Sequence, residues 1–218
     1  MKLLVPPQTG SLAGQTASRN RFGQYMRTRA IPVNPNSTAQ GLVRARLAAN
    51  STAWRDLTSA QRAGWSGLGI SMVRTDPLGQ TYSLQGNQAY NSVNNNRVMT
   101  GLATVSDAPA LTTPDALLTA TITLTAIAFS IAYTVTPLPA STYLAAYASP
   151  QRSAGRSFEG DFRLMKVSAA AAASPLAILT EYTAKFGVPV VGNRIFLSLV
   201  VVSAGFESGP LITSAVVA

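Results

Sequence analysis

The chain of 218 residues contains no cysteine and no histidine. Without cysteine it can form neither a disulfide nor a thiolate nucleophile, and without histidine it has no imidazole base near neutral pH. The side chains that most often bind zinc and copper are absent for the same reason. Most hydrolytic and redox mechanisms therefore have no candidate residues in this sequence.

Charge is also scarce, and acidic charge most of all. Only 11% of the residues are charged, against about 25% in a typical soluble domain. Eight acidic residues stand against 17 basic ones, which gives a net charge of +9. Because 47% of the residues are hydrophobic, the chain can still bury a substantial core. So weakly charged a surface suits a protein that is covered by its neighbours.

The basic residues are concentrated in the first half of the chain, and most of them are arginine. Residues 1–110 hold eleven basic and three acidic residues, whereas residues 111–218 hold six and five. Arginine gives up its hydration more readily than lysine and forms bidentate hydrogen bonds with carboxylates and phosphates. We therefore expect the first half of the chain to bind a partner.

No hydrophobic run approaches the length of a membrane span. The longest runs, around residues 169–173 and 197–202, are far shorter than the roughly 20 residues that a spanning helix needs. Residues 1–5 begin like a signal peptide, but Pro6 and Pro7 interrupt the apolar run. We expect neither a membrane partner nor an export signal.

Residues 1–36 are predicted to form an extended, arginine-rich arm. They contain four prolines and three glycines, and proline excludes regular helix and biases the preceding residue toward extended geometry. One short strand is predicted over residues 24–31, and alternation places its odd-numbered side chains from Tyr25 to Ile31 on one face. The candidate partner-binding residues are Arg19, Arg21, Phe22, Tyr25, Arg27, Arg29 and Ile31.

Three interpretations of this arm compete. Its arginines could neutralise phosphates while Phe22 and Tyr25 stack on bases, but no nucleic-acid-binding motif is present and the chain has only three lysines. The arm could fold back on its own domain, but eight acidic residues can neutralise few of its arginines. The third interpretation is an acidic protein partner, with the arm adding a strand to an exposed sheet edge. We favour the protein partner.

Residues 37–105 are predicted to be a small, mostly helical region. Residues 37–40 and 58–61 both have the hydroxyl-x-x-Gln spacing of a capping box, in which the two side chains cap free backbone amides. Trp54 and Trp65 could mark a binding face, but their apolar neighbours favour core positions. The predicted helices span residues 37–56, 59–71 and 85–99, and Gly101 follows the third.

The second half of the chain changes from helical to strand periodicity. Residues 106–114 are rich in proline and are the predicted linker. Beyond them, short segments alternate between hydroxyl and apolar side chains and are joined by Pro, Gly and Ser-rich turns. Seven strands are predicted, over residues 119–126, 129–135, 142–149, 161–167, 178–182, 195–203 and 211–217. This count and spacing predict an α+β protein whose residues 115–218 form an immunoglobulin-like or fibronectin type III-like antiparallel β-sandwich.

Few residues suggest chemistry. Glu159 and Asp161 are the only closely spaced carboxylates, but a calcium loop or a glycosidase pair needs further ligands and shaping that are absent. We interpret them as a solvated turn flanked by arginines. The glycines at 64, 67 and 69 match neither a dinucleotide fingerprint nor a P-loop. We expect no catalytic, cofactor-binding or metal-binding residues, and no enzymatic activity.

Residues 10–65 contain a distinctive pattern: S-R-N-R-x-G-x-Y-x-R-x-R, then an Asn-Pro and capping-box stretch, then W-R-x-L-T-x-x-Q-R-x-x-W. This pattern resembles that of a group of uncharacterised proteins from bacteriophage and prophage genomes. The matching residues are Ser18, Arg19, Asn20, Arg21, Gly23, Tyr25, Arg27, Arg29, Pro32, Asn34, Pro35, Gln40, Arg46, Trp54, Arg55, Leu57, Thr58, Gln61, Arg62 and Trp65. Members of this group often end in a fibronectin-like region.

The resemblance implies a virion structural protein, which is assembled in the host cytoplasm. We expect a capsid-associated auxiliary subunit, such as a decoration, cement or minor capsid protein, anchored by its N-terminal arm. Its partners would then be other virion proteins, the major capsid protein or tail and connector subunits, in many copies. The alternatives are a tail, baseplate or connector component, and a packaged nucleic-acid-binding protein.

Overall fold

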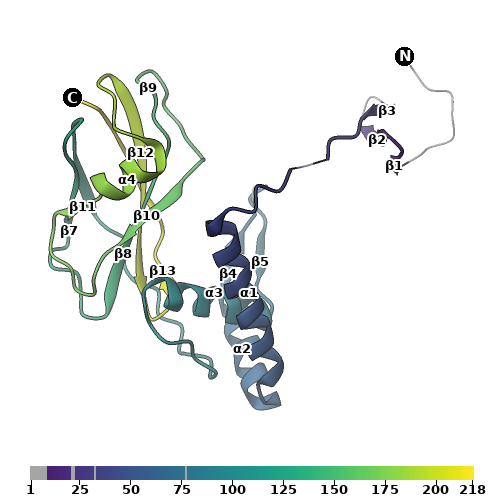
Figure 1. Ribbon diagram of the computed structural model, residues 1–218. Coiled ribbons are helices and arrows are strands. Elements are labelled where there is room, and N and C mark those ends of the chain that lie inside the picture. Colours follow the sequence, from purple (N-terminus) through teal and green to yellow (C-terminus); the bar gives the residue numbers. More distant parts are fainter. Residues whose placement is uncertain (1–8, 21–22, 32, 77) are drawn as a thin grey trace. The chain divides into compact units, whose positions relative to one another are not determined.

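The computed structural model describes residues 9–20, 23–31, 33–76 and 78–218 (Figure 1). The chain divides into two compact units, Met1–Val43 and Arg44–Ala218. The described residues form both helices and several antiparallel sheets, and no strand belongs to more than one sheet. The predicted α+β class is therefore confirmed.

The first unit contains a three-stranded antiparallel sheet in the order β1-β2-β3. Its strands are β1 (Gly10–Leu12), β2 (Gln15–Asn20) and β3 (Gly23–Thr28). The strand predicted over residues 24–31 is present as β3, although it ends at Thr28, but the prediction that it is the single strand of the arm was wrong. No proline lies between Pro7 and Pro32, so every intervening backbone amide can donate a hydrogen bond, and the tight turn at Ala13 and Gly14 reverses the chain.

The three predicted helices are confirmed as α1 (Thr38–Asp56), α2 (Ser59–Ser71) and α3 (Gly86–Met99). Before α2, the Thr58 hydroxyl accepts the Gln61 amide at 3.2 Å, and the Gln61 side chain accepts the Thr58 amide at 3.0 Å. After α3, Gly101 adopts a positive φ of 78°, as expected for the residue that follows a helix. Among the described residues, no helix is long and apolar enough to cross a membrane.

The helices share a small apolar core centred on Trp65, which is 0% exposed. Its ring meets the Tyr90 ring edge-on at 5.1 Å, and its indole N–H donates to the Ser106 carbonyl oxygen at 2.7 Å. The Trp54 ring lies 5.5 Å from Tyr90. Both tryptophans are therefore packing residues, as predicted. The buried members of this core are Leu57, Trp65, Leu68, Ala89, Tyr90, Val93 and Phe206.

Two antiparallel sheets dominate the second half of the chain. One has the order β11-β7-β6, from β6 (Thr119–Leu124), β7 (Phe129–Thr134) and β11 (Leu176–Ala177). The other has the order β10-β8-β12-β13, with β14 and β9 also paired to β12. Its strands are β8 (Thr142–Ala148), β9 (Arg152–Ser153), β10 (Arg163–Val167), β12 (Asn193–Ser203), β13 (Phe206–Glu207) and β14 (Leu211–Val216).

The two sheets face each other across one apolar core (Figure 1). Alternate side chains of the paired strands point inward, as expected for sheets with one buried face. Buried residues from both sheets contribute, among them Leu124, Phe129, Ile131, Leu144, Ala146, Met165, Leu176, Ile195, Leu197 and Leu199. A separate two-stranded hairpin, β4 (Val73–Thr75) with β5 (Thr81–Ser83), follows α2.

Six of the seven predicted strands are present, and the strand predicted at residues 178–182 is wrong. These residues begin helix α4 (Leu179–Phe186). Leu179, Tyr182 and Phe186 recur at helical spacing, and the Tyr182 and Phe186 rings lie 5.2 Å apart. Over only five residues, the alternation expected of a strand cannot be distinguished from the spacing of apolar residues on one face of a helix.

A hairpin at the end of β12 joins the two-sheet region to the helices. Residues 204 and 205 turn with positive φ values of 53° and 97°, as in the tight turns that suit twisted hairpins. The Asn96 side chain donates to the Gly205 carbonyl oxygen at 3.0 Å. The next residue, Phe206, is buried in the helical core. Helices and sheets of the second unit are thus packed together through this turn.

Candidate partner-binding surface

The structure places part of the predicted site on one face of the β1-β2-β3 sheet. Tyr25 lies opposite Ser18, and Arg27 lies opposite Thr16. Side chains two residues apart on a strand share a face, so Tyr25 and Arg27 form one continuous row. Arg29 extends the pairing beyond β3, because its amide donates to the Gly14 carbonyl oxygen at 2.8 Å.

Other predicted residues do not join that row. Arg19 lies opposite Gln24 and so faces the other side of the sheet, together with Met26. Ile31 lies beyond the end of β3 and is 76% exposed. Arg21 and Phe22 lie outside the described residues. The single-face prediction covered only residues 24–31 and did not assign a face to Arg19. The pairing of β2 with β3 places the Arg19 side chain on the other face of the sheet from Arg27.

The β1-β2-β3 sheet has no core of its own. In residues 9–43, none of the side chains that the structure describes is buried, and even Tyr25 and Met26 are 38% and 44% exposed. A small sheet normally needs a hydrophobic face packed against something to be stable. Within residues 9–43, neither face of this sheet is covered by a buried side chain among those described.

This sheet also has no acidic residue near it in the sequence. Residues 1–55 contain Lys2 and seven arginines but neither Asp nor Glu. Of the four ion pairs in the described part of the chain, none includes Arg19, Arg27 or Arg29. The described ion pairs therefore do not neutralise the positive charge of these three arginines.

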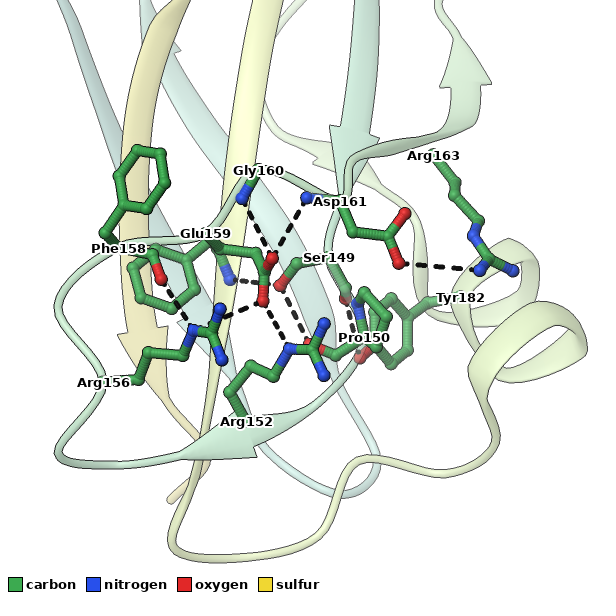
Figure 2. A network of polar contacts seen from close by, with 11 residues as sticks. Ser149, Pro150, Arg152, Arg156, Phe158, Glu159, Gly160, Asp161, Arg163 and Tyr182 are labelled. Atoms are coloured by element: carbon green, nitrogen blue, oxygen red, sulfur yellow. Dashed lines mark hydrogen bonds and ion pairs between the residues drawn. The ribbon is translucent and has the colours of Figure 1, made fainter. Parts of the chain in front are cut away.

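Glu159 is the centre of a second polar cluster, in the second unit (Figure 2). Its side chain is only 4% exposed and forms ion pairs with Arg152 and Arg156, the latter at 3.5 Å. Its other carboxylate oxygen accepts the backbone amides of Gly160 and Asp161 at 2.9 and 3.0 Å. The Asp161 amide and the Arg152 side chain, as hydrogen-bond donors, lower the pKa of Glu159 to about 2.

The interpretation of Glu159 and Asp161 as one solvated turn is therefore half wrong. Glu159 is a buried carboxylate that holds its loop together, whereas Asp161 is exposed and pairs with Arg163 at 3.6 Å. The two carboxylates have separate partners and do not share a site. No group of three or more potential metal ligands occurs within the described ranges.

Hydrogen bonds anchor this loop to the sheet. The Ser149 hydroxyl accepts the Phe196 amide at 3.0 Å, and the Tyr182 hydroxyl donates to the Ser149 carbonyl oxygen at 3.2 Å. Burial raises the pKa of Tyr182. Phe158 lies on the same loop yet remains 73% exposed. Sequence reasoning passed over Phe158, because a single aromatic residue among Arg, Ser and Gly carries no periodic signal.

A cleft of about 280 Å³ lies beside residues 112–117. Three of its hydroxyl groups have hydrogen-bond partners: Thr134 is bonded to Thr119 at 3.1 Å, Thr142 donates to the Ala140 carbonyl oxygen at 3.4 Å, and Ser203 donates to the Ser141 carbonyl oxygen at 3.5 Å. Asp115 is the only charged residue in its lining. The cleft thus offers one titratable group, whereas general acid–base catalysis commonly needs an acid and a base.

No protein-family model matches this chain, and a search of curated proteins finds no match either.

Proposed function

We propose that this chain is a structural subunit of a bacteriophage virion, attached to its neighbours by residues 9–43. One observation carries the proposal: these residues contain a three-stranded sheet, and they have no buried side chain among those described and no acidic residue. A sheet without a core is stabilised when a partner covers it. Because its arginines have no carboxylates nearby in sequence, that partner presents an acidic surface.

Within the virion we favour a capsid-associated auxiliary subunit, a decoration, cement or minor capsid protein. The second unit has its own cores, so it does not depend on the arm for folding. An arm that attaches a self-sufficient body suits a subunit that is added to a shell of major capsid protein in many copies. The resemblance of residues 10–65 to phage and prophage proteins supports the same conclusion.

We also propose that residues 115–218 form a fibronectin type III-like sandwich. One sheet contains β6, β7 and β11, and the other contains β8, β10, β12 and β14 together with the two-residue strands β9 and β13. With β9 and β13 set aside, the first, second and fifth of seven strands form one sheet, and the third, fourth, sixth and seventh form the other. An immunoglobulin constant domain has its fourth strand in the first sheet instead. The strand order therefore favours the fibronectin type III arrangement over the immunoglobulin one.

Particle purification tests the proposal. In phage particles from the genome that encodes this chain, quantitative mass spectrometry is expected to find it at a fixed, high stoichiometry. Deletion of residues 1–36 is expected to abolish incorporation, while the truncated chain still folds. Incorporation undiminished by the deletion would remove the arm from the proposal, and absence of the intact chain from purified particles would refute the virion assignment.

Two alternatives predict different results. A tail, baseplate or connector component would be found outside the capsid shell in a particle reconstruction. A packaged nucleic-acid-binding protein would bind DNA with an affinity that falls steeply as salt rises, by an amount set by its phosphate contacts. We rank this alternative lowest because the chain has only three lysines and no nucleic-acid-binding motif.

A further inference from the structure

The hydrogen bonds of β3 define which of its backbone groups are already used. Arg29 donates to the Gly14 carbonyl oxygen at 2.8 Å, and the register of β2 with β3 continues from this pair without interruption. In an antiparallel pair, hydrogen-bonded and non-hydrogen-bonded positions alternate. Tyr25 and Arg27 therefore exchange backbone hydrogen bonds with β2.

The backbone groups of the intervening residues point the other way. Gln24, Met26 and Thr28 direct their amides and carbonyls away from β2, toward the outer edge of β3. The order of this sheet is β1-β2-β3, and none of the other strands in the described residues pairs with that edge. The edge is thus an open row of donors and acceptors.

This edge lacks most of the features that protect natural edge strands. Such features include very short length, lysine, proline and bulges. β3 spans Gly23–Thr28, contains neither lysine nor proline, and pairs with β2 without a bulge. Its single charged residue is Arg27, which would repel a basic strand and attract an acidic one. At the opposite edge of the sheet, β1 is only three residues long.

We propose that the outer edge of β3 accepts an extended strand from an acidic segment of a virion partner, an inference that rests on the proposed function. The added strand would place its carboxylates beside Tyr25 and Arg27 and its apolar side chains beside Met26. The segment that fits best alternates acidic and apolar residues, because alternate side chains of a strand face opposite sides of a sheet.

A second copy of this chain fits this edge poorly. Residues 1–55 of the copy would bring no carboxylate, and the whole chain carries a net charge of +9. Two copies paired through β3 would place arginines near one another, which is unfavourable across adjacent strands. The observations therefore favour a different protein over self-association.

A proline substitution tests the edge directly. Met26→Pro removes an amide that points outward, so it is expected to spare pairing with β2 and to lower incorporation of the full chain into particles about tenfold. Met26→Ala is the matched control, because it changes the side chain and keeps the amide. Its incorporation is expected to stay within about twofold of the unsubstituted chain.

Hydrogen exchange gives a second readout that does not depend on the variant's folding. In the unsubstituted chain, the amides of Gln24, Met26 and Thr28 are expected to exchange rapidly when free and to become protected in assembled particles. The amides of Tyr25 and Arg27 are expected to show the smaller change. Unchanged exchange at the three edge amides on assembly would overturn the inference.

The two proposals fail in different ways. If deletion of residues 1–36 abolishes incorporation but Met26→Pro incorporates normally, the strand addition is wrong and the virion proposal stands. If the deletion itself has no effect, residues 9–43 are not the attachment site. Both the proposed attachment through the arm and the proposed strand addition at β3 are then wrong.

Discussion

The two units of this chain differ in what stabilises them. Residues 44–218 bury two apolar cores and hold all eight acidic residues and all four ion pairs found in the described ranges. Residues 9–43 contain the β1-β2-β3 sheet and the start of α1, and none of their described side chains is buried. Backbone hydrogen bonds thus shape this part of the first unit, whereas burial stabilises the second. This contrast is the basis of our proposal that the second unit is a self-sufficient body and that a partner covers the arm.

The largest test of this contrast compares two aromatic residues. Trp65→Ala is expected to lower the free energy of unfolding of the second unit by about 3–5 kcal/mol, because it leaves a cavity beside Tyr90 and removes the bond to the Ser106 carbonyl oxygen. Tyr25→Ala is expected to change it by less than about 0.5 kcal/mol. Chemical denaturation followed by tryptophan fluorescence or circular dichroism measures both. A Tyr25→Ala loss as large as that of Trp65→Ala would contradict the absence of a core in residues 9–43.

A smaller effect is expected at the turn that joins helices and sheets. A Cβ at Gly205 would lie 2.7 Å from the Val93 carbonyl oxygen, and φ there is +97°. Gly187 has a φ of +84° but no atom within 4 Å of the same position. Gly205→Ala is expected to cost about 3 kcal/mol and Gly187→Ala about 1 kcal/mol, measured by thermal or urea unfolding. Equal losses of unfolding free energy in the two variants would mean that the structure relieves the clash with α3. The turn at Gly205 would then not stabilise the packing of the helices.

The smallest effect concerns pH. Because Glu159 has a folded-state pKa of about 2 against an ordinary value of 4.5, its stabilising contribution is complete above about pH 4.5 and is lost as pH falls through about 2. Glu159→Gln is expected to remove this part of the pH dependence and to destabilise the chain at neutral pH. Urea midpoints at several pH values between 7 and 2 measure it.

The exposed neighbour Asp161 is the matched control for that experiment. Asp161→Asn is expected to leave the Glu159 dependence in place, because its ion pair at 3.6 Å to Arg163 involves two exposed side chains. If both variants reduce the pH dependence of the urea midpoint equally, the stability of the loop does not depend specifically on the buried carboxylate of Glu159.

Elements with local signals were predictable to within a residue or two. The capping residues Thr58 and Gln61 mark the start of α2, and Gly101 marks the end of α3, because both features act within one turn of the chain. Six strands of the two large sheets (β6, β7, β8, β10, β12 and β14) were found by alternation, whereas the two-residue strands β9, β11 and β13 were not predicted. α4 was missed because the spacing of Ile178 and Tyr182 fits both the strand period of 2 and the helix period of 3.6 over five residues. Only the packing of Tyr182 against Phe186 and Phe129 distinguishes the helix from a strand.

The candidate site was predictable in its charge but not in its shape. The excess of arginine and the shortage of carboxylates are properties of composition, so counting residues is enough to find them. The division of Arg19 from Arg27 depends on how β2 pairs with β3, and a shift of one residue would reverse the faces. The burial of Glu159 depends on Arg152 and Arg156 reaching it across a loop, which spacing alone does not specify.

The sequence by itself determined the boundaries of α1, α2 and α3, the α+β class and the positive, acid-poor character of the arm, because each follows from neighbouring residues or from counting. Only the tertiary structure decided that the arm is a sheet with an open edge, that residues 179–186 are helical, and that the turn at Gly205 enters the helical core. Those outcomes depend on contacts between residues distant in the chain, whose energies exceed local preferences.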